Sequence, residues 1–264
     1  MGCGNYKYFC NYKKFICSTS ITEHMTTMTN IEKALKDLRA GRFCLIYDND
    51  RRERETDLMI ASQFTTHEAV RRLRKDAGGL ICTTVPYFFH EKIEMPFLTD
   101  LYARANDYYK VLKALVANDI PYDAKSSFSL TINHRKTFTG VTDKDRALTI
   151  SEFAKLLQRS VDAGPDEVLA DFGRNFRTPG HVPLLNTSKE LLSRREGHTE
   201  LATAMIIMAG LAPSATICEM MGDNGDARSK DRAKVYAEKH DLAFLTGADV
   251  IEAWKGWGRT KTRK

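Results

Sequence analysis

The densest chemical signal in the sequence is the acidic run Asp48-Asn-Asp-Arg-Arg-Glu-Arg-Glu-Thr-Asp57, which follows a short apolar stretch. Its five carboxylates lie within ten residues, and they repel one another in a dry site unless a cation or protons offset their charge. Magnesium is a natural partner for clustered oxygens beside a phosphate. Arg51 and Arg52 add a site for an anion. A solvated charged loop is the plain alternative, and this run alone does not decide between them.

Three further segments carry residue types suited to catalysis. In Arg194-Arg-Glu-Gly-His-Thr-Glu200, glycine permits a tight backbone approach, and the N–H groups that open the next helix could hold a phosphate. Glu219 stands at the end of an apolar strand, where partial burial would raise its pKa and suit it to proton transfer. The third segment is Arg177-Thr-Pro-Gly-His181. Their ordinary alternatives are a capped helix start, a surface carboxylate and a turn histidine.

Two residues carry weaker signals. His134 lies in the polar turn of residues 133–140, which could contact a sugar phosphate but is more simply a solvated loop. Cys82 could line a pocket, although a thiol in a short apolar run is more typical of a core.

The elements that position these residues follow from capping and periodicity. Thr29 with Glu32, and Thr65 with Glu68, have the spacing of capping boxes. Alternation predicts a half-buried strand over residues 128–133, whereas residues 160–180, rich in Gly, Pro and Asp, are expected to form a long loop. Helices and strands mix without strict alternation, which favours one α+β domain with a layered, mixed sheet. The other expected helices span 149–159, 199–209 and 231–240, and the other strands 43–47, 80–85 and 215–218, before a closing strand and helix.

Net charge does not favour a nucleic-acid partner. The chain of 264 residues carries +6, but eight of its bases lie in residues 1–22 and 255–264, which contain no acid. The rest of the chain has 32 basic and 34 acidic residues. A nucleic-acid protein using the terminal Gly-Arg-Thr-Lys-Thr-Arg-Lys is therefore the weaker alternative. The sequence also contains no apolar run of the length that a membrane span needs.

The cysteines and the N-terminal segment bear on compartment and boundaries. Cys44, Cys82 and Cys218 sit in short apolar runs without a CxxC pair, which favours buried thiols in a reducing compartment. Residues 1–28 are rich in Tyr, Lys and Cys, and we expect an upstream start codon, with Met25 or Met28 as the true start, or a disordered extension. The expected catalytic domain is 29–254, followed by a basic tail, 255–264.

Taken together, these segments resemble the 3,4-dihydroxy-2-butanone 4-phosphate synthase family, and most closely its monofunctional archaeal branch. The resemblance covers about residues 30–252. It rests on the following stretches and on their order and spacing: YDNDRRERETDLMIASQF, KDAGGLIC, NDIPYDAKSSFSLTINHRKTFTGVTDKDRA, FRTPGHV, REGHTE and ICEMMGD.

The resemblance implies a fold, a reaction and partners. The fold would be a three-layer α/β/α sandwich with a mixed, twisted sheet, in a cytoplasmic homodimer with active sites at its interface. The enzyme would be a lyase of riboflavin biosynthesis that converts D-ribulose 5-phosphate to L-3,4-dihydroxy-2-butanone 4-phosphate and formate. Two Mg²⁺ ions per site, replaceable by Mn²⁺, would stabilise an enediolate. A metal-dependent phosphatase or isomerase acting on a sugar phosphate is the second enzyme reading.

The resemblance also implies roles for individual residues. Glu53 would bind both metal ions, His198 would ligate one of them, and Glu55 would assist. His181 and Glu219 would be the catalytic residues. The expected substrate-binding residues are Arg52, Glu53, Asp57, Arg195, Glu196, Gly197, His198, Thr199 and Glu219.

One position departs from the family pattern. Residue 54 is usually Gly, Asn or Asp in the family, and here it is Arg54. This cation could pair with Glu53 or Glu55 and weaken metal binding, or it could point to solvent, which we expect because the other matched residues are present.

Overall fold

The computed structural model describes residues 29–261, without the side chains of residues 259–261. The expected N-terminal extension therefore lies outside the described residues. The strands are β1 (Cys44–Tyr47), β2 (Thr56–Ala61), β3 (Cys82–Val85), β4 (Phe128–His134), β5 (Phe176–Asn186), β6 (Ala215–Glu219) and β7 (Phe244–Thr246). The helices are α3 (Asn30–Arg39), α4 (His67–Arg72), α5 (Tyr87–Lys92), α6 (Leu98–Ala105), α7 (Lys110–Ala114), α8 (Asp143–Arg159), α9 (Pro165–Asn175), α10 (His198–Ala209), α11 (Lys230–Lys239) and α12 (Gly247–Lys261).

The strands form one mixed, seven-stranded sheet in the order β4-β5-β3-β6-β2-β1-β7. The β1–β7 and β3–β5 pairs are parallel, and the other neighbours are antiparallel. Strands β1, β2 and β3 are buried along their whole length, as expected for a sheet covered on both faces.

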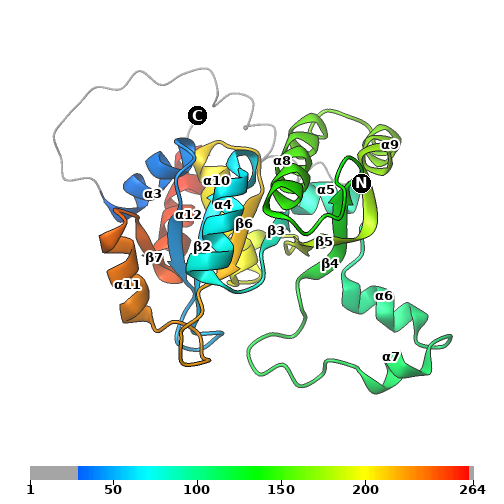
Figure 1. Ribbon diagram of the computed structural model, residues 1–264, viewed down its shortest axis with the longest axis horizontal. Coiled ribbons are helices and arrows are strands. Elements are labelled where there is room, and N and C mark those ends of the chain that lie inside the picture. The colour runs from blue at the N-terminus through cyan, green and yellow to red at the C-terminus, as the bar shows by residue number, and fades with distance from the viewer. Residues whose placement is uncertain (1–28, 262–264) are drawn as a thin grey trace.

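Two hydrophobic cores cover the two faces of this sheet. Successive residues of β2 alternate between them: Leu58 and Ile60 face one core, and Met59 and Ala61 face the other. Helices α4, α8, α9 and α11 contribute to the first core, and α3, α10 and α12 to the second (Figure 1). The predicted three-layer arrangement in a single domain is thus confirmed.

Several sequence expectations about individual elements were wrong. Residues 160–180 are not a long loop, because α9 and the start of β5 occupy most of that span. Pro165 stands in the first turn of α9, where its missing N–H costs nothing. The cap of α4 is Thr66 and not Thr65, since the Thr66 hydroxyl accepts the Ala69 N–H. Strand β2 and helices α5, α6 and α7 were not anticipated.

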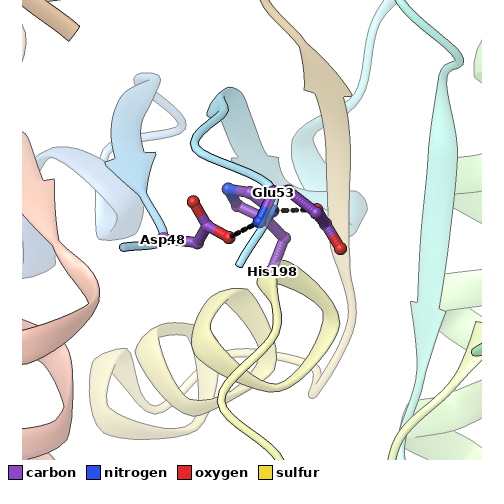
Figure 2. A group of neighbouring side chains, drawn as sticks. All are labelled: Asp48, Glu53 and His198. Carbon is purple, nitrogen blue, oxygen red and sulfur yellow. Dashed lines mark hydrogen bonds and ion pairs between the residues drawn. The ribbon is translucent and has the colours of Figure 1, made fainter. Parts of the chain in front are cut away.

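Two strand ends and one helix start meet at one edge of the sheet. This edge is formed by the ends of inner strands and not by an outer strand. Tyr47 at the end of β1 pairs with Thr56 at the start of β2, so residues 48–55 form the connection between two antiparallel strands. Asp57 is the register partner of Glu219 at the end of β6. The acidic run and Glu219 therefore share one edge, and α10 begins beside them (Figure 2).

At the C-terminus, α12 runs across the boundary expected after residue 254. Within residues 29–261, none of the helices combines the length and apolar character that crossing a bilayer demands.

Candidate active site

The acidic connection is organised by the buried side chain of Asp48. Its two carboxylate oxygens accept the backbone N–H groups of Glu53, at 2.8 Å, and Glu55, at 3.2 Å. Asp48 is 1% exposed, so these bonds replace the hydration that the carboxylate loses on folding. The turn is therefore held from within, and this orients Glu53 toward the start of α10.

Arg54 lies on the outer side of this turn. Its side chain is exposed, and its Nε donates to the Asp50 carbonyl oxygen at 2.9 Å. This confirms the expectation that Arg54 faces solvent. Its φ is +59°, a left-handed conformation that Gly, Asn and Asp adopt more readily than other residues. The turn geometry thus accounts for the residue types expected at this position.

Glu53 and His198 lie at the centre of the acidic end of the site, where the carboxylates of the 48–57 run gather. His198 Nδ1 lies 2.9 Å from Glu53 Oε2, and its Nε2 lies 3.7 Å from Asp57 Oδ1. Ligand atoms of Asp48, Glu53 and His198 all lie within 4.8 Å of one another (Figure 2). Among the described residues, His198 Nε2 and Asp57 Oδ1 are buried without a hydrogen-bond partner. Buried atoms that can ligate a metal and have no hydrogen-bond partner, beside clustered carboxylates, fit a divalent cation.

Burial and charge act in opposite directions on these groups. Burial lowers the pKa of His198, but the carboxylates of Asp57 and Glu53 outweigh it and raise that pKa to about 10. Burial, followed by the charges of Glu53 and Glu219, raises the pKa of Glu55. Burial also raises the pKa of Asp57 well above its ordinary value. The cluster therefore favours positive charge at its centre, which a proton or a metal ion can supply.

Glu219 is held at the same edge by the backbone before β3. Its Oε2 accepts the Leu80 N–H at 2.8 Å, and its carbonyl oxygen accepts the Gly79 N–H at 3.0 Å. A Cβ on Gly79 would lie 2.4 Å from Glu219 Oε2, so only glycine permits this approach. Glu219 is half-buried, as expected for a carboxylate at the end of an apolar strand.

Two arginines form the basic end of the site, which adjoins the acidic end because Arg52 Nη1 also lies 3.5 Å from Glu53 Oε1. Arg52 Nη2 and Arg195 Nε both donate to Asp123 Oδ2, at 2.5 Å and 2.7 Å. Both guanidinium groups pass close to Gly197, the N-cap of α10, where a Cβ would lie 2.4 Å from Arg195 Nη1 and 2.8 Å from Arg52 Nη1. Two cations therefore converge on a helix N-terminus, an arrangement suited to binding a phosphate.

A cavity of about 300 Å³ joins the two ends. Most of the residues predicted from the sequence line it: Arg52, Glu53, Glu55, Asp57, Arg195, His198, Thr199 and Glu219. Gly197 lies behind the arginines as the helix cap. Three predicted residues are therefore not in its wall: Gly197, Glu196, which is exposed, and His181, which lies on β5.

His181 has its own surroundings. Its side chain is exposed, its backbone N–H donates to Asn133 Oδ1 at 2.8 Å, and its Nδ1 lies 3.1 Å from Asn133 Nδ2. Asn133 Oδ1 also lies 3.4 Å from His181 Nδ1, so the amide holds the Nδ1 side of the imidazole in either tautomer. His181 is thus oriented with Nε2 available, but away from this chain's own cavity.

Sequence reasoning missed several residues of the cavity wall. Tyr122 and Asp123 come from the segment before β4, to which no role was assigned. Glu200 lies outside the cavity wall and was assigned no role either; it holds Arg195 from the buried side, with Oε2 2.6 Å from Nη1. Cys82 was not missed, since the sequence offered both a pocket and a core position for it, and the residue is buried and also lines the cavity. Burial raises the pKa of its thiol well above the ordinary range, so it stays protonated. A charged residue next to an aromatic one, as in Tyr122-Asp123, was the available signal for that segment.

Comparison with known proteins agrees with this geometry. The sequence profile described as 3,4-dihydroxy-2-butanone 4-phosphate synthase matches residues 32–253. The chain belongs to this family. A 3,4-dihydroxy-2-butanone 4-phosphate synthase of Methanothermobacter thermautotrophicus is 47% identical over 231 residues, which cover 87% of this chain and 98% of that protein.

Solved synthase structures share the fold. The Candida albicans synthase has a TM-score of 0.64 at 26% identity, covering 86% of this chain and 98% of that one. A synthase in complex with two magnesium ions also has a TM-score of 0.64, at 23% identity, with coverage of 84% and 95%. The mixed sheet and its covering helices are therefore those of the synthase family.

Proposed function

We propose that the chain converts D-ribulose 5-phosphate into L-3,4-dihydroxy-2-butanone 4-phosphate and formate, the reaction that supplies the four-carbon precursor of riboflavin. Membership of the synthase family supports this, and one observation carries it. A single cavity has a carboxylate–imidazole cluster at one end and two arginines over a helix N-terminus at the other. A sugar phosphate has matching ends, because its hydroxyl and carbonyl oxygens suit a metal and its phosphate suits the arginines.

The basic end positions the substrate. Arg52, Arg195 and the backbone N–H groups at the start of α10 would bind the phosphate, which takes no part in bond cleavage. Its binding energy therefore serves orientation. Buried Glu200 supports Arg195 from behind, because its Oε1 also accepts the Ser188 N–H at 2.9 Å and so cannot follow the arginine outward.

The acidic end would hold Mg²⁺, with Mn²⁺ as a possible substitute because imidazole is among the ligands. Glu53 and His198 are the proposed ligands, Glu53 contacting both of two ions, and Asp48 fixes the turn that carries Glu53. Bound divalent ions supply stabilisation of the negative charge that develops on the substrate oxygens once C3 loses its proton. The orphaned atoms of Asp57 and His198 support this assignment.

Glu219 is the proposed acid–base group supplied by this chain. The Leu80 N–H binds Oε2, which leaves Oε1 as the oxygen available to take or return a proton at the substrate. The carboxylate cannot swing freely, because Gly79 packs against it. A fixed carboxylate at the cavity wall meets the geometric demand of proton transfer.

We further propose that a cytoplasmic homodimer completes the site, with His181 of the partner subunit as the second catalytic residue. His181 does not line its own cavity, although Asn133 orients it. The turn after β4, whose Thr139 carbonyl accepts from Asn133, also bears two exposed apolar side chains, Phe138 at 94% and Val141 at 53%. Exposed apolar surface beside an oriented histidine supports coverage by a second copy.

Formate release is the test of the reaction. Purified protein with ribulose 5-phosphate and Mg²⁺ should release one formate per substrate, and EDTA or Glu53→Gln should abolish it. Glu238→Gln, an exposed change of the same kind on α11, should leave the rate unaltered. Phosphate release, or a pentose isomer without formate, would instead support a phosphatase or isomerase and refute the proposal.

Mixing two inactive variants tests the shared site. If His181 acts across the interface, a dimer of one Glu53→Gln chain and one His181→Asn chain contains one intact site. Random reassembly should then restore about a quarter of the wild-type formate rate, because half the dimers are mixed and each has one working site of two. No recovery, in a sample whose mass shows mixed dimers, would contradict the assignment of His181 in trans.

A further inference from the structure

The segment of residues 116–127, which connects α7 to β4, forms one wall of the cavity. Figure 1 shows it returning to the sheet from the projecting helices α6 and α7. Its residues in the cavity wall are Ile120, Tyr122, Asp123, Lys125, Ser126 and Ser127. A piece of chain that runs out from the body and back thus lines the space in which the substrate is proposed to bind.

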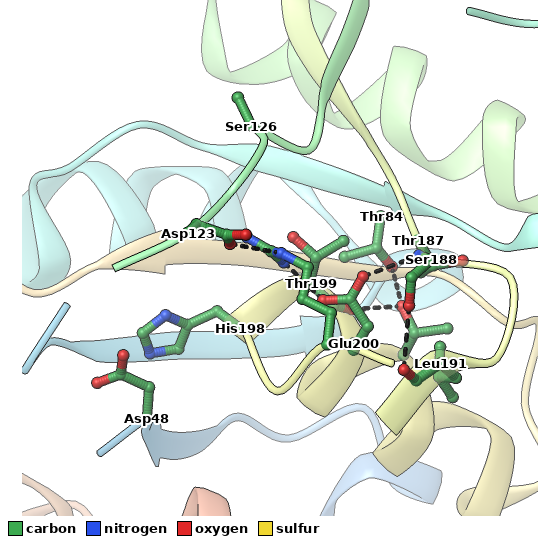
Figure 3. Close-up of polar contacts among 12 residues, drawn as sticks. Asp48, Thr84, Asp123, Ser126, Thr187, Ser188, Leu191, His198, Thr199 and Glu200 are labelled. Carbon is green, nitrogen blue, oxygen red and sulfur yellow. Dashed lines mark hydrogen bonds and ion pairs between the residues drawn. The ribbon is translucent and has the colours of Figure 1, made fainter. Parts of the chain in front are cut away.

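Asp123 holds this segment to the basic end of the site. One of its oxygens, Oδ2, accepts from both Arg52 and Arg195, at 2.5 Å and 2.7 Å. Figure 3 shows Asp123 with its dashed polar contacts in the same view as Thr199 and Glu200 at the start of α10. The Asp123 side chain is 14% exposed, and those of the two arginines are 11% and 19% exposed. These contacts are therefore shielded from water, where a charge-assisted hydrogen bond is strongest.

The other contacts near Asp123 differ in kind. The Tyr122 ring lies 5.7 Å from the Arg52 guanidinium carbon, which adds a second contact to the same arginine. Lys125 instead binds Asp100 on α6, at 2.6 Å, and lies over the Phe97 ring. Lys125 thus ties the segment to the projecting helices, whereas Asp123 and Tyr122 tie it to the phosphate-binding arginines.

We propose that the Asp123 carboxylate is an internal anion that occupies the phosphate-binding arginines and is displaced when phosphate binds. The inference rests on the proposed function, which assigns Arg52 and Arg195 to the phosphate. A phosphate dianion brings more charge and more acceptor oxygens to the two guanidinium groups and the helix N-terminus than one carboxylate does. Substrate binding therefore releases the 116–127 segment from its contact with the cavity's basic end.

An internal competitor lowers the apparent affinity of every anion that uses the same arginines. Asp123→Asn removes the charge and keeps the shape. In calorimetric titrations with inorganic phosphate, this variant should bind about tenfold more tightly than wild type, which corresponds to about 1.4 kcal/mol. Asp119→Asn, the same charge change at an exposed position of the segment, should bind phosphate as wild type does.

Equal or weaker phosphate binding by Asp123→Asn would overturn the proposal, because it would mean that Asp123 positions the arginines for phosphate. Amide hydrogen exchange on the unmodified chain gives a second test that does not depend on a variant folding. Saturating phosphate should speed exchange in residues 116–127 and slow it at the start of α10. Slower exchange in residues 116–127 would show that phosphate tightens the segment and would equally overturn the displacement.

Neither readout requires turnover. A chain that releases no formate would refute the proposed reaction but leave both phosphate experiments interpretable. Conversely, an active enzyme whose Asp123→Asn variant binds phosphate no more tightly would refute the displacement alone.

Discussion

Metal binding should displace a proton from His198, and the affinity of the protein for the metal ion should therefore rise with pH. In the metal-free protein, burial opposes a charge on the imidazole, but Asp57 and Glu53 overcome it and raise the pKa to about 10. A metal ion ligates only the neutral ring. Metal and proton therefore compete for the same position.

The size of the effect follows from that pKa. A pH of about 7.5 is about 2.5 units below the pKa of the His198 ring. Competition from the proton therefore lowers the apparent metal affinity about 300-fold. The sign is fixed by the raised pKa: the free protein keeps the proton up to about pH 10, and metal affinity increases until that point. Between pH 7 and pH 9, affinity should gain about tenfold per unit.

Calorimetric titration with Mn²⁺, in buffers of different ionisation enthalpy, measures both the affinity and the protons released. Wild type should release about one proton more than His198→Asn, whose affinity should depend much less on pH. His67→Asn, at an exposed histidine, should behave as wild type. An affinity that does not change between pH 7 and pH 9, or equal proton release from wild type and His198→Asn, would refute His198 as a protonated metal ligand.

Three substitutions test the local geometry. Arg54→Asn should raise the free energy of unfolding by about 0.5–1 kcal/mol in urea titrations, because asparagine tolerates the left-handed backbone better; a loss of stability would contradict the strain. Gly79→Ala should cost about 1–3 kcal/mol and slow formate release, since its Cβ meets Glu219. Gly173→Ala, in open space inside α9, should instead raise stability by about 0.5–1 kcal/mol and leave formate release unaltered. Phe153→Ala should cost about 3–5 kcal/mol of stability, because its fully buried ring packs against α9 and β5. Thermal and urea unfolding measure this cost. A cost below about 1 kcal/mol would mean that the core collapses into the space left by the ring.

Local patterns predicted elements where one signal dominated. The capping box at Thr29 is present as expected, and α10 begins and ends within a residue of its prediction. Strand β2 was missed because both of its faces are buried, so its apolar residues follow one another without alternation. The span 160–180 was misread because Gly and Pro, which often mark loops, here cap α9 and occupy its first turn.

The sequence by itself determined the chemistry at this site: the acidic run, the basic helix start and Glu219 are recognisable because they are contiguous or stand at strand ends. Only the tertiary structure decided their arrangement. Antiparallel register places Asp57 opposite Glu219, and burial turns Asp48 into the group that closes the turn. Asp123 on the arginines and His181 outside the cavity depend on long-range packing between segments distant in sequence. Local propensity carries no information about such contacts, since side chains far apart in the chain meet only after the sheet has formed.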